Sequence, residues 1–132
     1  MATILDVDAI ATDDDLANEV ASRARLERAN RDETQRDAIR ERALDDVLTA
    51  LQTRAPPITE AMLANPAELK QAVVYRALSK IFLSAIAVEG DLHDVLHRNY
   101  EREYQAAVRA RFTTGPMDAG QTTGYSVSIG RR

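Results

Sequence analysis

Two histidines one helical turn apart, His93 and His97, have the spacing of a pair of metal ligands. A helix through this region would place both rings on one face. The chain has no cysteine, and the nearby carboxylates Asp91, Asp94 and Glu101 are of the kind that cover a solvated helix surface. We therefore interpret the two histidines as solvated residues and expect no metal site.

Hydroxyl and carboxylate side chains give no better support for catalysis. Ser79 and Ser84 have no histidine at a plausible position to activate them, so nucleophilic catalysis is not indicated. The acidic run 13–15 lies where the start of a helix favours negative charge. Glu101 and Glu103 fit a solvated helix face better than an acid–base pair. We expect no catalytic residue, no cofactor and no enzymatic activity.

A stretch of mixed charge covers residues 23–46, with seven arginines and seven acidic residues. Arginine side chains can contact phosphates, but the interleaved acids favour a solvated helix. Alternating charges also suit many weak ion pairs along a subunit contact or a channel. The candidate residues for such a subunit or channel face are Arg23, Arg28, Arg31, Arg36 and Arg40.

The composition is that of one small domain with a single core. The chain has 132 residues, and its four tyrosines, two phenylalanines and five glycines argue against a fold rich in sheets and turns. The lack of cysteine is typical of a reducing compartment, and no basic residue precedes Arg23 as a signal peptide would require. The longest apolar run, 81–88, is too short to cross a membrane. We expect a soluble intracellular protein that does not bind membranes.

The clearest structural pattern is a pair of amphipathic helices near 66–89 and 91–112. Asn65 suits an N-cap, Pro66 suits the first helical position, and Glu68 is placed to close a capping box with Asn65. Gly90 is placed for a left-handed C-cap, and Asp91 for the cap of the second helix. The short connection forces the two helices to run antiparallel. The apolar stripe of the second helix comprises Leu92, Val95, Leu96, Tyr100, Tyr104, Val108 and Phe112.

A third helix is predicted near 33–54, ended by Pro56 and Pro57. Its apolar residues recur at helical spacing, so the three helices can bury one another. Thr12 or Asp13 can cap an earlier helix. Either one helix runs over 13–54, or it breaks near Asn30–Asp32; we favour the break because no large apolar residue supports that stretch.

Both ends of the chain differ from this helical domain. Residues 3–10 alternate weakly and predict a short strand or an extended arm, and the glycine-rich stretch after Phe112 predicts a flexible linker. Tyr125, Val127 and Ile129 alternate with serines, which is typical of a strand with one apolar face. The expected fold is mainly α, a small antiparallel helical bundle, with order at both ends arising only on binding. Its parts are an N-terminal arm (1–12), a helical domain (13–112) and a C-terminal tail (113–132) containing a strand (125–129).

Part of the chain resembles the small head–tail adaptor proteins of tailed bacteriophages and related gene-transfer particles, also called head-completion or connector proteins. The residues that carry the likeness are ALDDVLTAL at 43–51, PPITEAMLANPAELKQAVVYRALSKIF at 56–82 and NYEREYQAAV at 99–108. In that family a helix opening on ELK.AVVYRAL is followed, after a short turn, by one containing Y.R.Y; here these are ELKQAVVYRAL at 68–78 and YEREY at 100–104. The likeness covers a little over half of the chain. The N-terminal stretch 13–38 departs from the family pattern.

The resemblance implies a structural virion protein at the neck of the particle, assembled in the host cytoplasm. Such proteins form a ring, typically dodecameric, beneath the portal protein, and bind a tail-completion or tail-terminator protein on the other face. DNA passes through the central channel without sequence-specific binding. We expect the tail to pair with the portal or a neighbouring subunit, through Tyr125, Val127, Ile129, Arg131 and Arg132.

A competing hypothesis is a small helical regulator that binds DNA or a partner helix as a dimer. The arginine-rich stretch supports it. Against it, the sequence has no helix-turn-helix spacing, and acids balance the arginines over 23–46.

Overall fold

The computed structural model describes residues 5–114, which form five α-helices packed as a small bundle. The predicted mainly-α class is therefore confirmed. Within the described range no strand forms, and Leu63 and Thr114 make an isolated antiparallel bridge. No helix in this range is long and apolar enough to span a membrane. The elements in chain order are η1 (Val7–Ala9), α1 (Asp13–Val20), α2 (Arg23–Ala29), α3 (Glu33–Thr53), η2 (Glu60–Met62), η3 (Pro66–Leu69), α4 (Lys70–Ala85) and α5 (Leu92–Val108), where η denotes a 3₁₀ turn.

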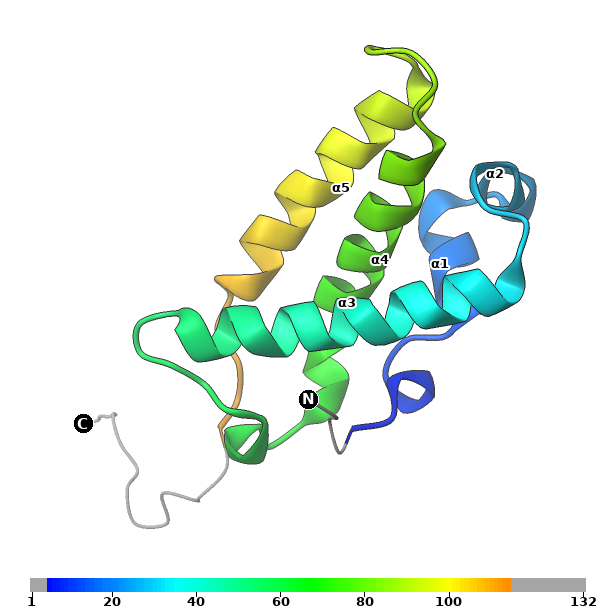
Figure 1. The fold of residues 1–132 in the computed structure, drawn as a ribbon. Coiled ribbons are helices and arrows are strands. Elements are labelled where there is room, and N and C mark those ends of the chain that lie inside the picture. Colours follow the sequence, from blue (N-terminus) through cyan, green and yellow to red (C-terminus); the bar gives the residue numbers. More distant parts are fainter. Residues whose placement is uncertain (1–4, 115–132) are drawn as a thin grey trace.

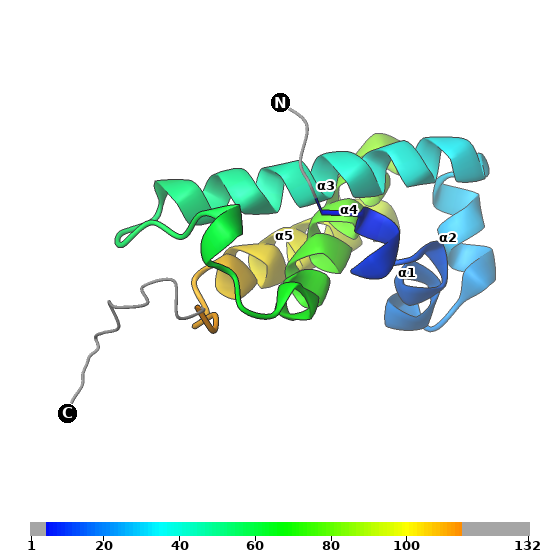
Figure 2. The same ribbon diagram turned by 90° about the horizontal axis from the view of Figure 1, so that it is seen from below.

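The centre of the fold is the antiparallel hairpin of α4 and α5, which α3 crosses on one side (Figures 1 and 2). Helices α1 and α2 lie against α4, beside the N-terminal end of α3. Helix α4 is apolar on most of its surface and is covered by all four other helices, so it forms the middle of the core. The largest fully buried side chains are Phe82, Leu16, Leu26, Leu44, Leu51, Leu69, Leu78 and Ile81.

Capping residues set the start of several helices. Asp32 accepts hydrogen bonds from the backbone of Thr34 at 2.9 Å and so begins α3, which confirms the predicted break near residues 30–32. Asp91 accepts from Asp94 N at 2.9 Å and begins α5, as expected. Thr12 and Asp15 form a reciprocal capping box at the start of α1.

A second break, between α1 and α2, carries no signal that the sequence analysis detected. Ala21 ends α1 in the left-handed region, with φ +58°, and Ser22 Oγ accepts from Arg25 N at 3.1 Å to begin α2. Left-handed backbone is ordinarily the place of glycine or asparagine, and alanine does not mark it. The two short helices contact each other across this break, and Figure 1 shows α2 end-on beside α1.

The expected capping box between Asn65 and Glu68 is wrong. Asn65 accepts from Ala67 N at 3.2 Å, but the turn that it caps is the 3₁₀ turn η3, and α4 starts only at Lys70. The Glu68 carboxylate instead accepts from the backbone N of Thr113 at 2.8 Å and from its Oγ1 at 2.9 Å. Glu68 therefore fastens the chain after α5 to the turn before α4.

The prediction of a strand or extended arm over residues 3–10 is wrong for the described part, 5–10. Asp6 accepts from Asp8 N at 3.0 Å and starts the 3₁₀ turn η1, and Val7, Ile10 and Ala11 are buried in the core. The apolar residues of this segment therefore have a partner within the same chain. The expectation that the N-terminal arm is ordered only on binding fails for residues 5–12, while the predicted strand 125–129 lies outside the described residues.

Candidate functional site

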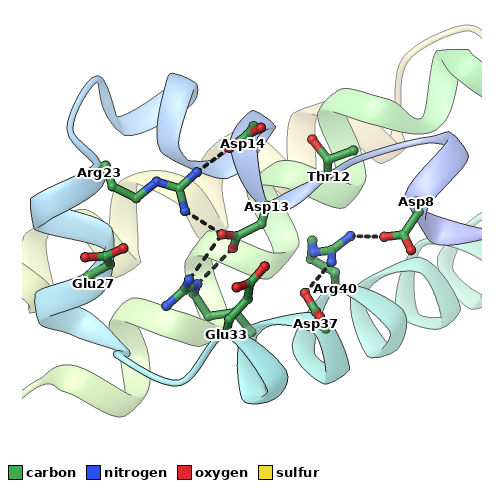
Figure 3. A pocket seen from close by; sticks show the side chains of 10 residues that line it. Asp8, Thr12, Asp13, Asp14, Arg23, Glu27, Glu33, Asp37 and Arg40 are labelled. Atoms are coloured by element: carbon green, nitrogen blue, oxygen red, sulfur yellow. Dashed lines mark hydrogen bonds and ion pairs between the residues drawn. The ribbon is translucent and has the colours of Figure 1, made fainter.

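One strongly polar site in the described structure is a charged junction, which we define as Asp8, Asp13, Asp14, Arg23, Arg36, Asp37 and Arg40 (Figure 3). It lines a hollow of about 650 Å³ between η1, α1, α2 and α3.

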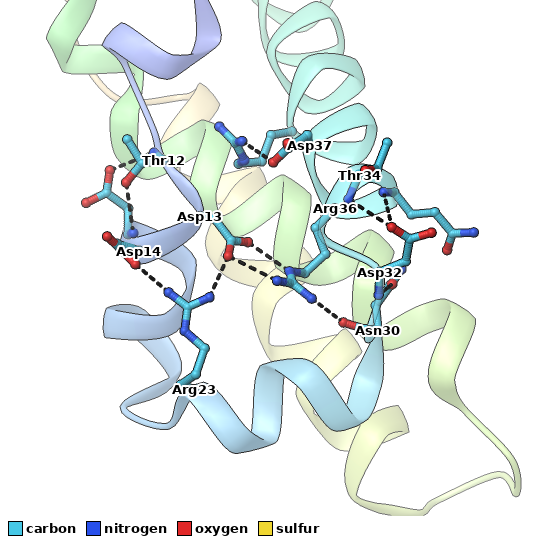
Figure 4. Close-up of polar contacts among 12 residues, drawn as sticks. Thr12, Asp13, Asp14, Arg23, Asn30, Asp32, Thr34, Arg36 and Asp37 are labelled. Atoms are coloured by element: carbon cyan, nitrogen blue, oxygen red, sulfur yellow. Dashed lines mark hydrogen bonds and ion pairs between the residues drawn. The ribbon is translucent and has the colours of Figure 1, made fainter.

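Asp13, the first residue of α1, is at its centre. Its Oδ1 accepts from Arg36 Nε at 2.8 Å and its Oδ2 from Arg36 Nη2 at 3.1 Å (Figure 4). Arg23 also donates to Oδ2, so two guanidinium groups share one carboxylate.

The electrostatics of this contact keep all three groups charged. Burial by itself raises the pKa of Asp13, but the hydrogen bonds from Arg36 and Arg23 more than offset this and hold that pKa below its ordinary value. The hydrogen bonds that Arg36 donates to the Asp13 carboxylate in turn raise the pKa of Arg36. Arg36 Nη1 also donates to the carbonyl of Asn30 at 2.6 Å, which closes the turn between α2 and α3.

Arg40 likewise connects the N-terminal turn η1 to α3. Its Nη1 donates to Asp8 Oδ1 at 2.7 Å and to the carbonyl of Ala11 at 2.8 Å, and its Nη2 donates to Asp37 (Figure 3). Each arginine of the charged junction thus already contacts a carboxylate of its own chain. The arrangement ties η1, α1 and α2 to α3, and it is suited to holding these elements rather than to binding an anion.

The predicted subunit or channel face therefore needs correction. Arg36 and Arg40 are only 2% and 4% exposed, so these two side chains do not line an outer surface. Arg23 is half-buried, and Arg28 and Arg31 remain exposed. The carboxylates that pair with these two arginines are Asp13 and Asp8, which precede the mixed-charge stretch, and Asp37, which belongs to it and is about half exposed.

A second cluster joins Ser79 on α4 to His97 and Glu101 on α5. Ser79 Oγ donates to Glu101 Oε1 at 2.9 Å and lies 3.2 Å from His97 Nδ1. The prediction that no histidine lies near Ser79 is wrong, because the hairpin brings His97 to it from eighteen positions along the chain.

The hydrogen bonds of this cluster do not activate the serine. His97 Nδ1 lies 2.9 Å from the carbonyl oxygen of Ser79, and a carbonyl oxygen only accepts, so Nδ1 carries the proton. That nitrogen is then unable to take a proton from Ser79 Oγ. Ser79 is also 1% exposed, so the geometry is that of a structural contact between helices.

Glu101 continues into a network that connects three helices. Glu101 Oε1 accepts from Arg76 Nη1 at 2.9 Å, and Arg76 Nε donates to Asp46 Oδ2 at 2.9 Å. Lys80 lies 3.1 Å from the same Asp46 oxygen, and Tyr104 Oη donates to the Asp46 carbonyl at 3.3 Å. Burial raises the pKa of Asp46, but its hydrogen bonds with Arg76 and Lys80 leave it below the ordinary value.

Aromatic rings fill the rest of the α4–α5 interface. Tyr100 stacks on Tyr75 and on Phe82, with ring centroids 6.0 and 5.9 Å apart, and Phe82 stacks on His93 at 5.8 Å. Burial, with Glu19 and Tyr75 nearby, raises the pKa of Tyr100 to about 12.

The two histidines act within this interface and do not pair with each other. His93 Nδ1 lies 3.1 Å from the carbonyl oxygen of Ala85, and His97 Nδ1 contacts Ser79 as described. Residues 5–114 contain no group of three or more histidine, cysteine or acidic side chains arranged to hold a metal ion.

The tip of the α4–α5 hairpin, in contrast to the charged junction, exposes apolar side chains. Helix α4 ends at Ala85, four residues before the predicted end, and Gly90, with the expected positive φ of +86°, lies in the connecting turn. Four large apolar side chains remain 47% to 67% exposed around this turn, and we call them the tip patch: Leu83, Val88, Leu92 and Val95. The apolar spacing of the second helix predicts Leu92 and Val95 in the core, which is wrong. Helix α3 crosses the hairpin away from its tip, so it does not cover them (Figure 1).

Comparison with known protein families, with curated proteins and with solved structures finds no match to this chain. What the described structure itself shows is a five-helix bundle with a charged junction at one end of α3 and exposed apolar side chains at the tip of the α4–α5 hairpin.

Proposed function

We propose that this protein is a head–tail adaptor, a structural subunit of a ring that joins the portal of a phage-like particle to its tail. The observation that carries the proposal is the Asp46–Arg76–Glu101 network. One of these residues comes from each of the three segments that resemble the adaptor family, 43–51, 56–82 and 99–108. The resembling segments are thus joined in one structural unit by specific side chains, as a shared fold requires.

The chemistry of the described residues supports a binding role. The serine with a histidine neighbour is buried and not activated, and the arginines of the charged junction contact carboxylates of their own chain. The tip patch, by contrast, exposes large apolar side chains, as surfaces that bind other proteins commonly do.

In the proposed ring, one face binds the portal, the other binds a tail-completion or tail-terminator protein, and DNA passes through the centre. Tyr125, Val127, Ile129, Arg131 and Arg132 remain the proposed contacts of the tail with the portal or a neighbour. Of the proposed subunit or channel face, Arg28 and Arg31 are exposed and retain this role, with Arg23 at its edge.

The experiment is an in-frame deletion of the gene in the strain that produces the particles, followed by electron microscopy. The expected result is filled or partly filled heads without tails, restored to tailed particles by the wild-type gene. In the restored particles, antibody labelling should place the protein at the neck. Normal tailed particles after deletion would overturn the proposal, and specific DNA binding by the purified protein at physiological salt would favour the dimeric regulator instead.

A further inference from the structure

The tip patch consists of four apolar side chains at one end of the hairpin that the described structure leaves exposed. Leu83 lies in the last turn of α4, Val88 in the connecting turn, and Leu92 and Val95 in the first turn of α5. Leu92 and Val95 are three residues apart on a helix and therefore share one face. These four side chains are the large hydrophobic residues that remain exposed within residues 5–114.

We propose that the tip patch binds residues 125–132 of a second copy of this chain. In an extended conformation Tyr125, Val127 and Ile129 would lie on one face, an apolar counterpart to the patch. Apolar side chains suit such a surface, because their removal from water together with the patch is favourable.

The charges of the two segments are complementary. Residues 86–95 carry three carboxylates, Glu89, Asp91 and Asp94, and no lysine or arginine. Asp94 is buried and pairs with Arg98 at 3.1 Å, and Asp91 accepts hydrogen bonds from the backbone of Ala87 and Val88, so Glu89 is the exposed carboxylate of this segment. Arg131 and Arg132 follow the apolar residues of the tail after one glycine, so they would lie close to Glu89 when Ile129 is bound.

The position of Thr114 favours a second copy over the same chain. Thr114 bridges to Leu63, beyond the C-terminal end of α5, while the tip patch surrounds its N-terminal end. Helix α5 has 17 residues and is thus about 25 Å long. Ten residues lie between Thr114 and Tyr125. To bind the chain's own tip they would have to run back along the whole hairpin, whereas a copy placed end to end presents its tip where the tail leaves the bundle.

Donor and acceptor surfaces at opposite ends make the contact head-to-tail, and repetition of such a contact produces rings or filaments. The inference deepens the proposed function, and it rests on that function for the closure of the assembly into a ring. The contact itself is testable without particles.

The experiment measures the association of the full-length protein by sedimentation velocity over a range of concentrations. The tip variant carries Val88→Asp and Leu92→Asp, and the tail variant carries Val127→Asp and Ile129→Asp. A control variant carries Ser126→Asp and Ser128→Asp, which add the same charges on the other face of the extended tail. Circular dichroism verifies that all variants retain the helical signal.

The wild type and the control variant should associate, and the tip and tail variants should each lose association by at least about tenfold and remain monomeric. An equimolar mixture of the two defective variants should form a species of two chains and nothing larger. The tail variant keeps an intact tip and the tip variant keeps an intact tail, so one contact is possible per pair.

Two results would overturn the inference. One is a wild-type protein that stays monomeric at all concentrations, as binding within one chain or the absence of binding would produce. The other is a tail variant that still associates, as a symmetric contact between two tips would allow. Neither result bears on whether the protein is found at the neck of particles, so failure of this inference and failure of the proposed function are distinguishable.

Discussion

The charged junction and the tip patch invert the usual distribution of side chains in opposite ways. At the junction, Asp13, Arg36 and Arg40 are buried, although charged residues are seldom buried unless paired. At the tip, Val88 is 67% exposed and Leu92 54%, although a helical hairpin ordinarily buries such residues. The two regions lie on different elements of one small bundle (Figure 1).

The two regions differ in whether their side chains have a suitable partner within the same chain. Each buried arginine of the junction contacts a carboxylate of its own chain, so its charge is paired within one molecule, although Arg40 Nε is buried without a hydrogen-bond partner among the described residues. The apolar side chains of the tip have no such partner among residues 5–114. The junction therefore helps to fix how the helices pack. The apolar side chains of the tip, by contrast, can be removed from water only by a further binding partner. Substitutions at the junction should therefore lower the free energy of unfolding, whereas substitutions at the tip should leave it nearly unchanged.

The largest effect is expected for Asp13→Ala. This change leaves Arg36 buried without its carboxylate, and removal of one partner of a buried ion pair costs about 3–5 kcal/mol. Urea denaturation followed by circular dichroism measures the free energy of unfolding.

The matched control is Asp14→Ala, since Asp14 also contacts Arg23 but its side chain is 85% exposed. We expect that control to remain within about 0.5 kcal/mol of the wild type. Equal losses for the two variants would show that the junction is not a buried structural contact.

A smaller effect is expected from acid. The pKa of Asp13 and that of Asp46 are below their ordinary values in the folded protein, so the unfolded chain takes up protons first as the pH falls. The stability contributed by these carboxylates is fully present above their ordinary pKa, near pH 4, and is lost as the pH falls through the folded values.

Urea midpoints at pH 7, 5 and 3 test this dependence. The midpoint should change little between pH 7 and 5 and fall toward pH 3. The Asp13→Asn variant should be less stable at pH 7 and should show a smaller fall. An unchanged slope in that variant would mean that Asp13 does not titrate with folding.

Local features of the fold could be predicted because their signals are local. The helical spacing of apolar residues and the cap at Asp32 give the bounds of α3 to within one residue, and Asp91 marks the start of α5. The break after α2 was also predictable, since the apolar spacing stops there. The left-handed Ala21 has no such mark in the sequence, and the break that it makes was missed.

The polar contacts of the junction and the hairpin could not be predicted from local pattern. Asp13 and Arg36 are 23 positions apart, and Ser79 and His97 are 18 apart. Their pairing follows from the way the helices pack, which sequence spacing does not encode. The exposure of Leu92 was missed for a related reason, because periodicity identifies an apolar face but not the element that covers it.

The smallest effect on stability is expected at the tip. Leu92→Ala removes a side chain that is already about half exposed and introduces a better helix former, so the free energy of unfolding should change by less than about 0.5 kcal/mol. The matched change Leu78→Ala, at a side chain with no exposure, should cost about 2–5 kcal/mol. Denaturation is best measured at a concentration low enough to keep the protein monomeric, since self-association through the tip would add to its apparent stability. A loss at Leu92 as large as that at Leu78 would mean that the tip is covered within the single chain, and it would then no longer be available to a partner.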